Sequence, residues 1–128
     1  TIAPLVQTLA ELEAEFLSSE RTHSLILKAW EPSKIIGSIR AYEQNRTCYI
    51  GRVIVDPDYQ NRGIGAKLMN EIESRFSQVL RYELFTGYKD EKNLYFYGKL
   101  GYKQFREEIH GDNLKMIFLE KVKDNLTP

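Results

Sequence analysis

The chain has 128 residues, of which 42% are hydrophobic and 28% charged, values that are ordinary for one globular domain with a core of its own. Its 18 basic and 18 acidic side chains cancel, which argues against a nucleic acid or an anionic membrane as a partner, because both favour a basic surface. No apolar run approaches the roughly 20 residues of a membrane-spanning helix, and the first residues do not resemble a signal peptide. We expect a single domain over residues 1–128.

The first half of the chain predicts one helix followed by three strands. Apolar residues recur at helical spacing over residues 4–18, which indicates an amphipathic helix. They are Leu5, Leu9, Leu12 and Phe16. Strands are then predicted over residues 23–30, 34–43 and 47–55, joined by short polar connections of the kind that antiparallel hairpins use.

The second half predicts two more helices and three more strands. A helix over residues 63–77 is followed by a strand over 79–86, a helix over 91–100 that stops at Gly101, and a hairpin of strands over 102–109 and 114–121. Because a helix lies between the third strand and the fourth, these two strands are expected to be parallel. The predicted order is α-β-β-β-α-β-α-β-β, a mixed sheet with helices on its faces.

Cysteine and histidine give little chemistry. The single cysteine, Cys48, cannot form an internal disulfide, which favours a reducing cytoplasm, and we expect it to be a small apolar side chain on a strand rather than a nucleophile. The only histidines are His23 and His110, and no Cys/His cluster has the spacing of metal ligands. We therefore expect a cytoplasmic protein without a metal.

The turn between the third strand and its helix has the features of a phosphate site. A β-branched run stops at Pro57, passes through a polar loop and enters the helix through Gly63 and Gly65. A helix start offers unpaired N–H groups and a positive dipole end, glycines let the backbone approach an anion, and Arg62 adds a charge. The sequence predicts a pyrophosphate cradle, built from Gln60, Asn61, Arg62, Gly63, Ile64, Gly65 and Ala66.

Two other glycine-loop motifs fit less well, and a loop without a ligand stays open as an alternative. A dinucleotide fingerprint would place a third glycine where Leu68 stands. A nucleotide-triphosphate loop would need Gly-Lys-Ser/Thr, which Gly65-Ala66-Lys67 does not supply. The remaining alternative is a glycine-softened turn that binds nothing.

Two motifs together resemble the GNAT superfamily of acyl-CoA-dependent N-acyltransferases. The segment Gln60-Asn61-Arg62-Gly63-Ile64-Gly65 matches the family's phosphate-binding signature, and an Asn–Tyr–Gly-aromatic pattern follows at Asn93, Tyr97 and Gly101-Tyr102. The resemblance covers about residues 25–119. It implies an α/β (α+β) fold, namely a mostly antiparallel mixed sheet with a splayed central parallel strand pair and flanking helices.

The resemblance also implies an activity and roles for named residues. The family transfers an acetyl group from acetyl-CoA to a primary amine of a small molecule or a peptide. Main-chain groups of Ile54 and Val55 would then pair with the pantetheine arm, Asn93 would hydrogen-bond it, and Tyr97 would protonate or hydrogen-bond the leaving thiolate. The residues alone favour Tyr97 as a core aromatic side chain, and it is the resemblance that favours a functional role.

The base that accepts the amine proton is less well defined. Glu83 is the first candidate, and Glu43 and Tyr49 are weaker ones. Strand alternation places Arg81, Glu83 and Phe85 on one face of the sheet, so the alternative is that Glu83 points to solvent or pairs with Arg81.

Family members usually begin with a strand and a helix before the first helix expected here, so the resemblance implies an N-terminally incomplete domain. This keeps open a second hypothesis, a non-catalytic acyl-CoA-binding module. Because family members often dimerise through their C-terminal strands, a homodimer is one possible assembly. The acceptor amine is not identified by the sequence.

Overall fold

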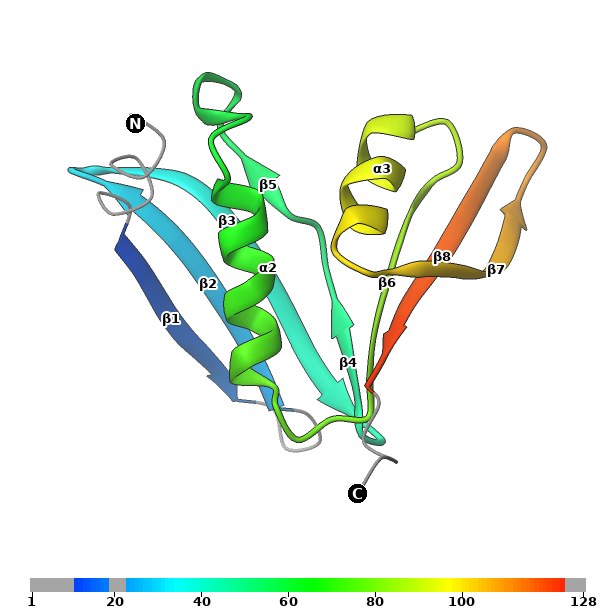
Figure 1. The fold of residues 1–128 in the computed structure, drawn as a ribbon, viewed down its shortest axis with the longest axis horizontal. Helices are drawn as coiled ribbons and strands as arrows, with labels where there is room; N and C mark the ends of the chain where they lie inside the picture. Colours follow the sequence, from blue (N-terminus) through cyan, green and yellow to red (C-terminus); the bar gives the residue numbers. More distant parts are fainter. Residues whose placement is uncertain (1–10, 19–22, 124–128) are drawn as a thin grey trace.

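The computed structural model describes residues 11–18 and 23–123, and Figure 1 shows the arrangement of their helices and strands. In chain order the elements are β1 (Glu11–Ser18), β2 (His23–Glu31), β3 (Lys34–Gln44), β4 (Thr47–Ile50), β5 (Ile54–Val55), the 3-10 turn η1 (Pro57–Tyr59), α2 (Ile64–Arg75), β6 (Arg81–Gly87), α3 (Glu91–Lys99), β7 (Lys103–His110) and β8 (Leu114–Val122). None of the helices in these ranges is long and apolar enough to cross a membrane.

The strands form one sheet in the order β1-β2-β3-β4-β6-β8-β7, with β5 paired to β3 beside this path. Every pairing is antiparallel except that of β4 with β6, which is parallel. The expected fold class is therefore confirmed, including the central parallel pair.

The predicted N-terminal helix is wrong where it can be compared. Residues 11–18 form β1, antiparallel to β2, with Leu12 opposite Ala29 and Phe16 opposite Leu25; residues 4–10 lie outside the described residues. The spacing of Leu12 and Phe16 fits both a helix and a strand, because a separation of four residues is common to both periods. Ala14 completes the alternation of a strand, and pairing with β2 gives alternate main-chain groups of this segment a partner.

The central parallel pair opens into a wedge. The pairing of β4 with β6 covers only Thr47–Arg81, Cys48–Tyr82 and Tyr49–Glu83. Beyond that point β6 stays with β8, while the other side breaks at residues 51–53 and resumes as β5 against β3. The single strand expected over residues 47–55 is thus two strands, and Figure 1 shows the two halves of the sheet diverging between β5 and β6.

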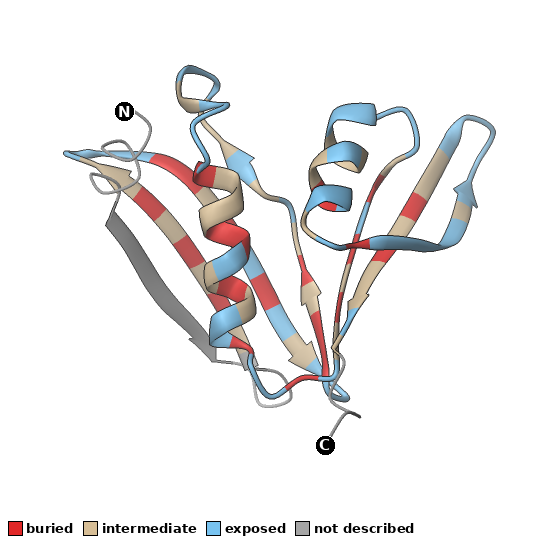
Figure 2. Cartoon of the chain, viewed as in Figure 1, coloured by how far each residue is buried: buried red, intermediate tan, exposed pale blue. Residues whose placement is uncertain are grey.

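Both helices lie on one face of the sheet and enclose the core with it (Figures 1 and 2). The apolar stripe of α2 is buried, as its helical spacing predicts, and α2 lies so close to β3 that a Cβ on Gly37 would be 3.2 Å from atoms of both Ile64 and Leu68. Cys48 is fully buried, which confirms its prediction as an apolar side chain, and burial raises the pKa of its thiol to about 12. No described helix covers the opposite face.

Candidate functional site

The turn that leads into α2 has an unusual backbone. The Asp56 carboxylate accepts a hydrogen bond from the Asp58 N–H (2.9 Å), which holds the 3-10 turn. Asn61 and Gly63 then adopt positive φ angles of 63° and 81°, a conformation that glycine tolerates best and asparagine better than most residues. These two positive φ angles turn the chain after β5 so that it can begin α2.

The first turn of α2 leaves its N–H groups unpaired within the helix. Gly63 is the N-cap residue and has no side chain to close the helix start. The first intrahelical bond recorded at this end is that of the Lys67 N–H to the Gly63 carbonyl. The N–H groups of residues 64–66 therefore have no partner within α2, which is the condition for binding an anion at a helix start.

Arg62 contributes positive charge beside this helix start. Its guanidinium lies 5.0 Å from the centre of the Tyr59 ring, and it makes no ion pair with the residues that the structure describes. Lys34, on the other hand, is paired with Asp56 at 3.2 Å. The Asp58 amide and then Lys34 lower the pKa of the Asp56 carboxyl. Arg62 is thus the uncompensated cation at this turn.

The second glycine of the motif has a packing role. A Cβ on Gly65 would lie 3.2 Å from Cζ of Phe96 on α3 and 3.7 Å from Cγ1 of Val53. The absent side chain lets α2 approach α3 across the wedge. Gly63 serves the turn, whereas Gly65 serves this contact between helices.

The wedge-facing edge of β5 carries main-chain groups. The Asp56 N–H donates to the Ile36 carbonyl of β3, so the alternation of a strand turns Ile54 toward β3 and Val55 toward the wedge. Gln60 donates from Nε2 to the Val55 carbonyl at 3.3 Å, and Lys92 of α3 donates to Gln60 Oε1 at 3.5 Å. The side chain of Gln60 therefore bridges the two sides of the wedge at its outer end.

Tyr97 reaches the inner part of the wedge from α3. The residue is only 4% exposed, and burial raises the pKa of its phenol, while a hydrogen bond with the Val53 backbone acts in the opposite direction. A raised pKa keeps the hydroxyl protonated at neutral pH. The side chain is therefore part of the core, which is the alternative given above for Tyr97. Its hydroxyl also lies at the break between β4 and β5.

Asn93 is partly engaged by the cap of its own helix. Asp90 is the N-cap of α3, and its carboxylate accepts hydrogen bonds from the Asn93 N–H (3.1 Å) and from Asn93 Nδ2 (2.8 Å). The side-chain carbonyl of Asn93 has no recorded partner among the described residues. It is the group of Asn93 that remains for a ligand.

Glu83 lies on the face of the sheet opposite α2 and α3. Strand alternation predicts that it shares a face with Arg81. Its carboxylate is 3.0 Å from Arg81 and 3.7 Å from Arg106, and its side chain is 13% exposed. The predicted pairing with Arg81 is thus present. Glu83 also lines a cleft on this face, and its role as the base stays a prediction.

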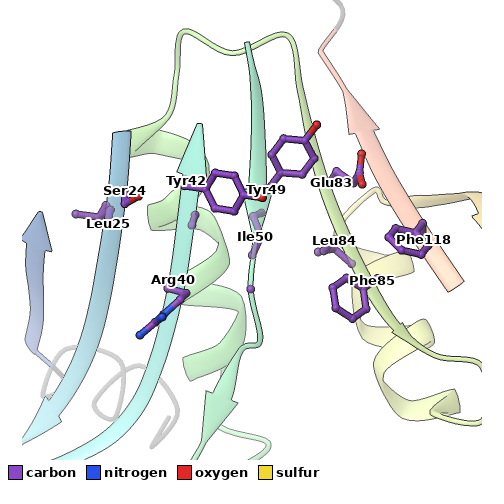
Figure 3. Close-up of a pocket in the computed structure, with 12 residues that line it drawn as sticks. Ser24, Leu25, Arg40, Tyr42, Tyr49, Ile50, Glu83, Leu84, Phe85 and Phe118 are labelled. Atoms are coloured by element: carbon purple, nitrogen blue, oxygen red, sulfur yellow. The ribbon is translucent and has the colours of Figure 1, made fainter. Parts of the chain in front are cut away.

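This cleft has a volume of about 520 Å³ and lies where β4 and β6 part (Figure 3). Most of its lining is apolar or aromatic, and it comes from both halves of the sheet. The lining residues are Ser24, Leu25, Arg40, Ala41, Tyr42, Tyr49, Ile50, Gly51, Glu83, Leu84, Phe85 and Phe118. The volume is typical of sites for small molecules.

The two weaker base candidates and His110 lie in three different places. Tyr49 lines the cleft and stacks on Tyr42 with ring centres 5.2 Å apart. Glu43 lines a separate hollow at the end of β3, beside residues 76–78, and His110 contacts Glu108 at the tip of the β7–β8 hairpin. Tyr49 is therefore near the predicted chemistry, whereas Glu43 and His110 are not.

Several residues of the site were not singled out from the sequence. Val53 meets Tyr97 because the strand breaks after Ile50, and Gly51 within a β-branched run was a signal for that break. Arg40 and Tyr42 share the cleft face by strand alternation along β3. In the described ranges no group of three His, Cys, Asp or Glu side chains gathers as metal ligands would.

Solved structures of known proteins share this fold. The PaiA N-acetyltransferase of Thermoplasma acidophilum, in complex with coenzyme A, is 24% identical with a TM-score of 0.67, over 78% of this chain and 61% of that chain. This chain thus spans about three fifths of that protein. The Bacillus subtilis acetyltransferase in complex with CoA is 16% identical with a TM-score of 0.73, over 89% of this chain and 99% of that chain.

A third solved structure is the ribosomal-protein-S18-alanine N-acetyltransferase of Escherichia coli, which is 14% identical with a TM-score of 0.72, over 90% of this chain and 98% of that chain. No curated protein sequence gives a significant match. The family model described as "Acetyltransferase (GNAT) domain" matches residues 4–123. The chain therefore belongs to the GNAT acetyltransferase family.

Proposed function

We propose that this protein transfers an acetyl group from acetyl-CoA to a primary amine. One observation carries the proposal: the uncapped start of α2 lies at the outer end of a wedge in the sheet, and the Tyr97 hydroxyl lies farther in, at the Val53 amide. Family membership and the CoA complexes of two structural neighbours support acetyl-CoA as the donor.

The residues at the start of α2 fit a diphosphate. Gly63 is exposed and adds no side chain, so an anion can approach the N–H groups of Ile64, Gly65 and Ala66. The loop residues Gln60 and Asn61 shape this approach, and Arg62 supplies a charge with no acidic partner among the described residues. Such charge-assisted bonds are about twice as strong as neutral ones.

The amide-containing arm of the donor would pair with the wedge-facing edge of β5, where the Val55 carbonyl already accepts one hydrogen bond from Gln60. Val55 presents its main chain to the wedge, and Ile54 sets the register by pairing with Ser38 of β3. An extended ligand that adds to a strand edge gains main-chain hydrogen bonds without further ordering of the protein. Asn93 lies on the opposite wall of the wedge, and its side-chain carbonyl would accept a hydrogen bond from an amide of the same arm.

Tyr97 would act as the acid that completes the transfer. As the amine nitrogen bonds to the acetyl carbon, the C–S bond breaks and the sulfur needs a proton. Tyr97 holds one on a phenol whose pKa burial raises, so the proton is present at neutral pH. Positioning of the amine beside the thioester supplies much of the remaining rate acceleration.

Glu83 is proposed as the base that accepts the proton lost by the amine. The carboxylate faces the cleft at the level where β4 and β6 separate, and Arg81 and Arg106 hold it in place. Tyr49 lines the same cleft and could relay the proton through water.

The proposal is tested first by donor binding. Arg62→Ala should weaken CoA binding at least about tenfold in calorimetry and reduce its salt dependence, because it removes one charge–phosphate contact. Arg75→Ala is the matched control, since Arg75 lies in the last turn of α2 and pairs with Glu71. If Arg62→Ala and the control bind CoA as tightly as the parent protein, the predicted diphosphate site is wrong.

Turnover separates an enzyme from a non-catalytic CoA-binding module. Thiol release from acetyl-CoA should be measured over a panel of amino acids, polyamines, arylalkylamines and peptides. Release that depends on one class of amine supports the transferase. Tight CoA binding without release on any acceptor would instead support the module.

A further inference from the structure

The cleft on the sheet face opposite α2 ends beside the break at which Tyr97 lies. Ile50 and Gly51 line the cleft, and Val53, two residues farther along, bonds with Tyr97. If acetyl transfer takes place at Tyr97, as the proposed function requires, an acceptor in this cleft reaches the thioester from the face of the sheet that no described helix covers. The residues that line the cleft therefore indicate which class of amine can bind as the acceptor.

Aromatic rings form two walls of the cleft. On one side Tyr42 stacks on Tyr49 with ring centres 5.2 Å apart and planes 24° apart. On the other side Phe85 packs against Phe118 with centres 5.3 Å apart, and Figure 3 shows the two pairs on opposite sides of the wedge. Tyr42 and Phe85 are 40% and 54% exposed, so each wall presents ring surface that a flat apolar group would cover.

The charges in the cleft do not suit a polycation. Among the described residues of the lining Glu83 is the only acidic one, and its carboxylate contacts Arg81 and Arg106, which also pair with Glu120 and Glu108. A polyamine with several positive charges would find one carboxylate in this lining, and that carboxylate already has two cationic partners. The charged side chain of the lining that has no charged partner among the described residues is a positive one.

That charge is Arg40. Its guanidinium makes no ion pair or hydrogen bond with the described residues, and its stem packs on Gly51, where a Cβ would lie 3.0 Å from Cγ. Figure 3 shows Arg40 and Glu83 at different ends of the cleft. The part of Arg40 beside Gly51 is its aliphatic stem, so an anionic group bound to the guanidinium would lie on the β3 side of the cleft.

We infer that the acceptor is an aromatic or apolar α-amino acid. Its side chain would lie between the Tyr42–Tyr49 and Phe85–Phe118 walls, and its carboxylate would pair with Arg40. The amino group is attached to the carbon next to the carboxylate, and with the side chain between the two walls it would be directed from Arg40 toward the opening of the wedge. Arg40 is a specificity residue in this arrangement, and it takes no part in proton transfer.

The test compares phenylalanine with two analogues that each lack one group. Phenethylamine has the amine but no carboxylate, and 3-phenylpropionate has the carboxylate but no amine. Phenylalanine should be acetylated with the lower KM, and Arg40→Gln should raise that KM about tenfold or more while changing the KM of phenethylamine less than about twofold. Arg75→Gln, on the outer side of α2, should change neither.

Binding of 3-phenylpropionate supplies a measurement that does not require turnover. It should bind in calorimetry, compete with phenylalanine in the assay, and lose both properties in Arg40→Gln. Arg40-dependent binding without acetylation of any amine would overturn the proposed function and leave the cleft assignment standing.

Other results would overturn the inference and leave the transferase intact. These are a preference for spermidine or phenethylamine over phenylalanine, an equal effect of Arg40→Gln on phenylalanine and phenethylamine, or faster acetylation of a C-terminally amidated phenylalanyl peptide. The last result would show that the acceptor is a peptide N-terminus and that a free carboxylate is not recognised.

Discussion

Gly65 of α2 faces the ring of Phe96 on α3 so closely that a Cβ would lie 3.2 Å from Cζ. The two helices pack on either side of the wedge, and this contact is where they approach each other. The absence of a side chain at Gly65 therefore allows the two helices to approach this closely.

Gly65→Ala should lower the melting temperature and weaken CoA binding. Overpacking costs about 1–3 kcal/mol, which exceeds the gain of about 0.5–1 kcal/mol from replacing glycine by alanine in a helix. Adding Phe96→Leu should recover most of the stability, because the smaller side chain leaves room for the methyl group. Gly98→Ala on α3 is the control: nothing lies within 4 Å of its Cβ position, so it should stabilise. Equal effects of the two alanine substitutions would contradict the contact.

Much of the fold could be predicted from the sequence because local signals agreed with the final structure. The stripe of α2, the polar turns between β2, β3 and β4, and the closing hairpin of β7 and β8 each have one period or one turn pattern. Residues 11–18 have no such single period, because the spacing of Leu12 and Phe16 fits a helix and a strand equally. Only the pairing of β1 with β2, a long-range interaction, resolves that ambiguity.

Some residues of the candidate site could likewise be predicted from the sequence, and others could not. The residues of the phosphate turn are adjacent in sequence, so a motif could identify them together. The contact of Gly65 with Phe96 and that of Glu83 with Arg106 join elements that are distant in the chain. No local pattern predicts which side chains meet across a wedge, although the Asp90 cap of Asn93 is a short-range pattern that the sequence does contain.

Tyr97→Phe should lower kcat about 100-fold, the lower end of what a positioned proton donor contributes, and leave the Kd of CoA unchanged. Because the pKa of Tyr97 is raised, the parent enzyme should keep its acid form through neutral pH and should not lose activity below about pH 10, the ordinary tyrosine value. Tyr95→Phe on the same helix is the control, since that ring is 70% exposed. A parallel loss of CoA affinity and turnover in Tyr97→Phe would indicate a structural role instead.

Glu83→Gln should lower kcat at neutral pH, and the loss should shrink as the pH rises and the amine becomes neutral without help. The substitution also removes an ion pair with Arg81, so a matched control is needed. Glu120→Gln provides it, because Glu120 contacts the same Arg81 at 2.8 Å and is not part of the cleft. If the two variants lose the same activity at every pH, Glu83 acts through Arg81 and is not the base.

Alkaline pH should destabilise the fold through buried acids, two of which are Cys48 and Tyr82. Burial raises the pKa of Cys48 and of Tyr82 to about 12, above the ordinary values of about 8.5 and 10. A group whose folded pKa is raised stabilises the fold fully below its unfolded pKa and loses that contribution as the pH rises toward the folded value. The free energy of unfolding should therefore decline from about pH 9 to about pH 12.

Replacing Cys48 with alanine separates the two contributions. The variant should be less stable at neutral pH, because a buried side chain is truncated, and should lose less stability between about pH 9 and 10, because its thiol no longer ionises in the unfolded chain. Tyr82 still titrates in the variant, and its hydroxyl donates to the main-chain carbonyls of Glu73 and Phe76, so a decline at higher pH should remain. Denaturant unfolding followed at several pH values measures both slopes. Identical slopes for the parent and Cys48→Ala below pH 10 would show that the thiol ionises equally easily in the folded and unfolded chains, against its burial in β4.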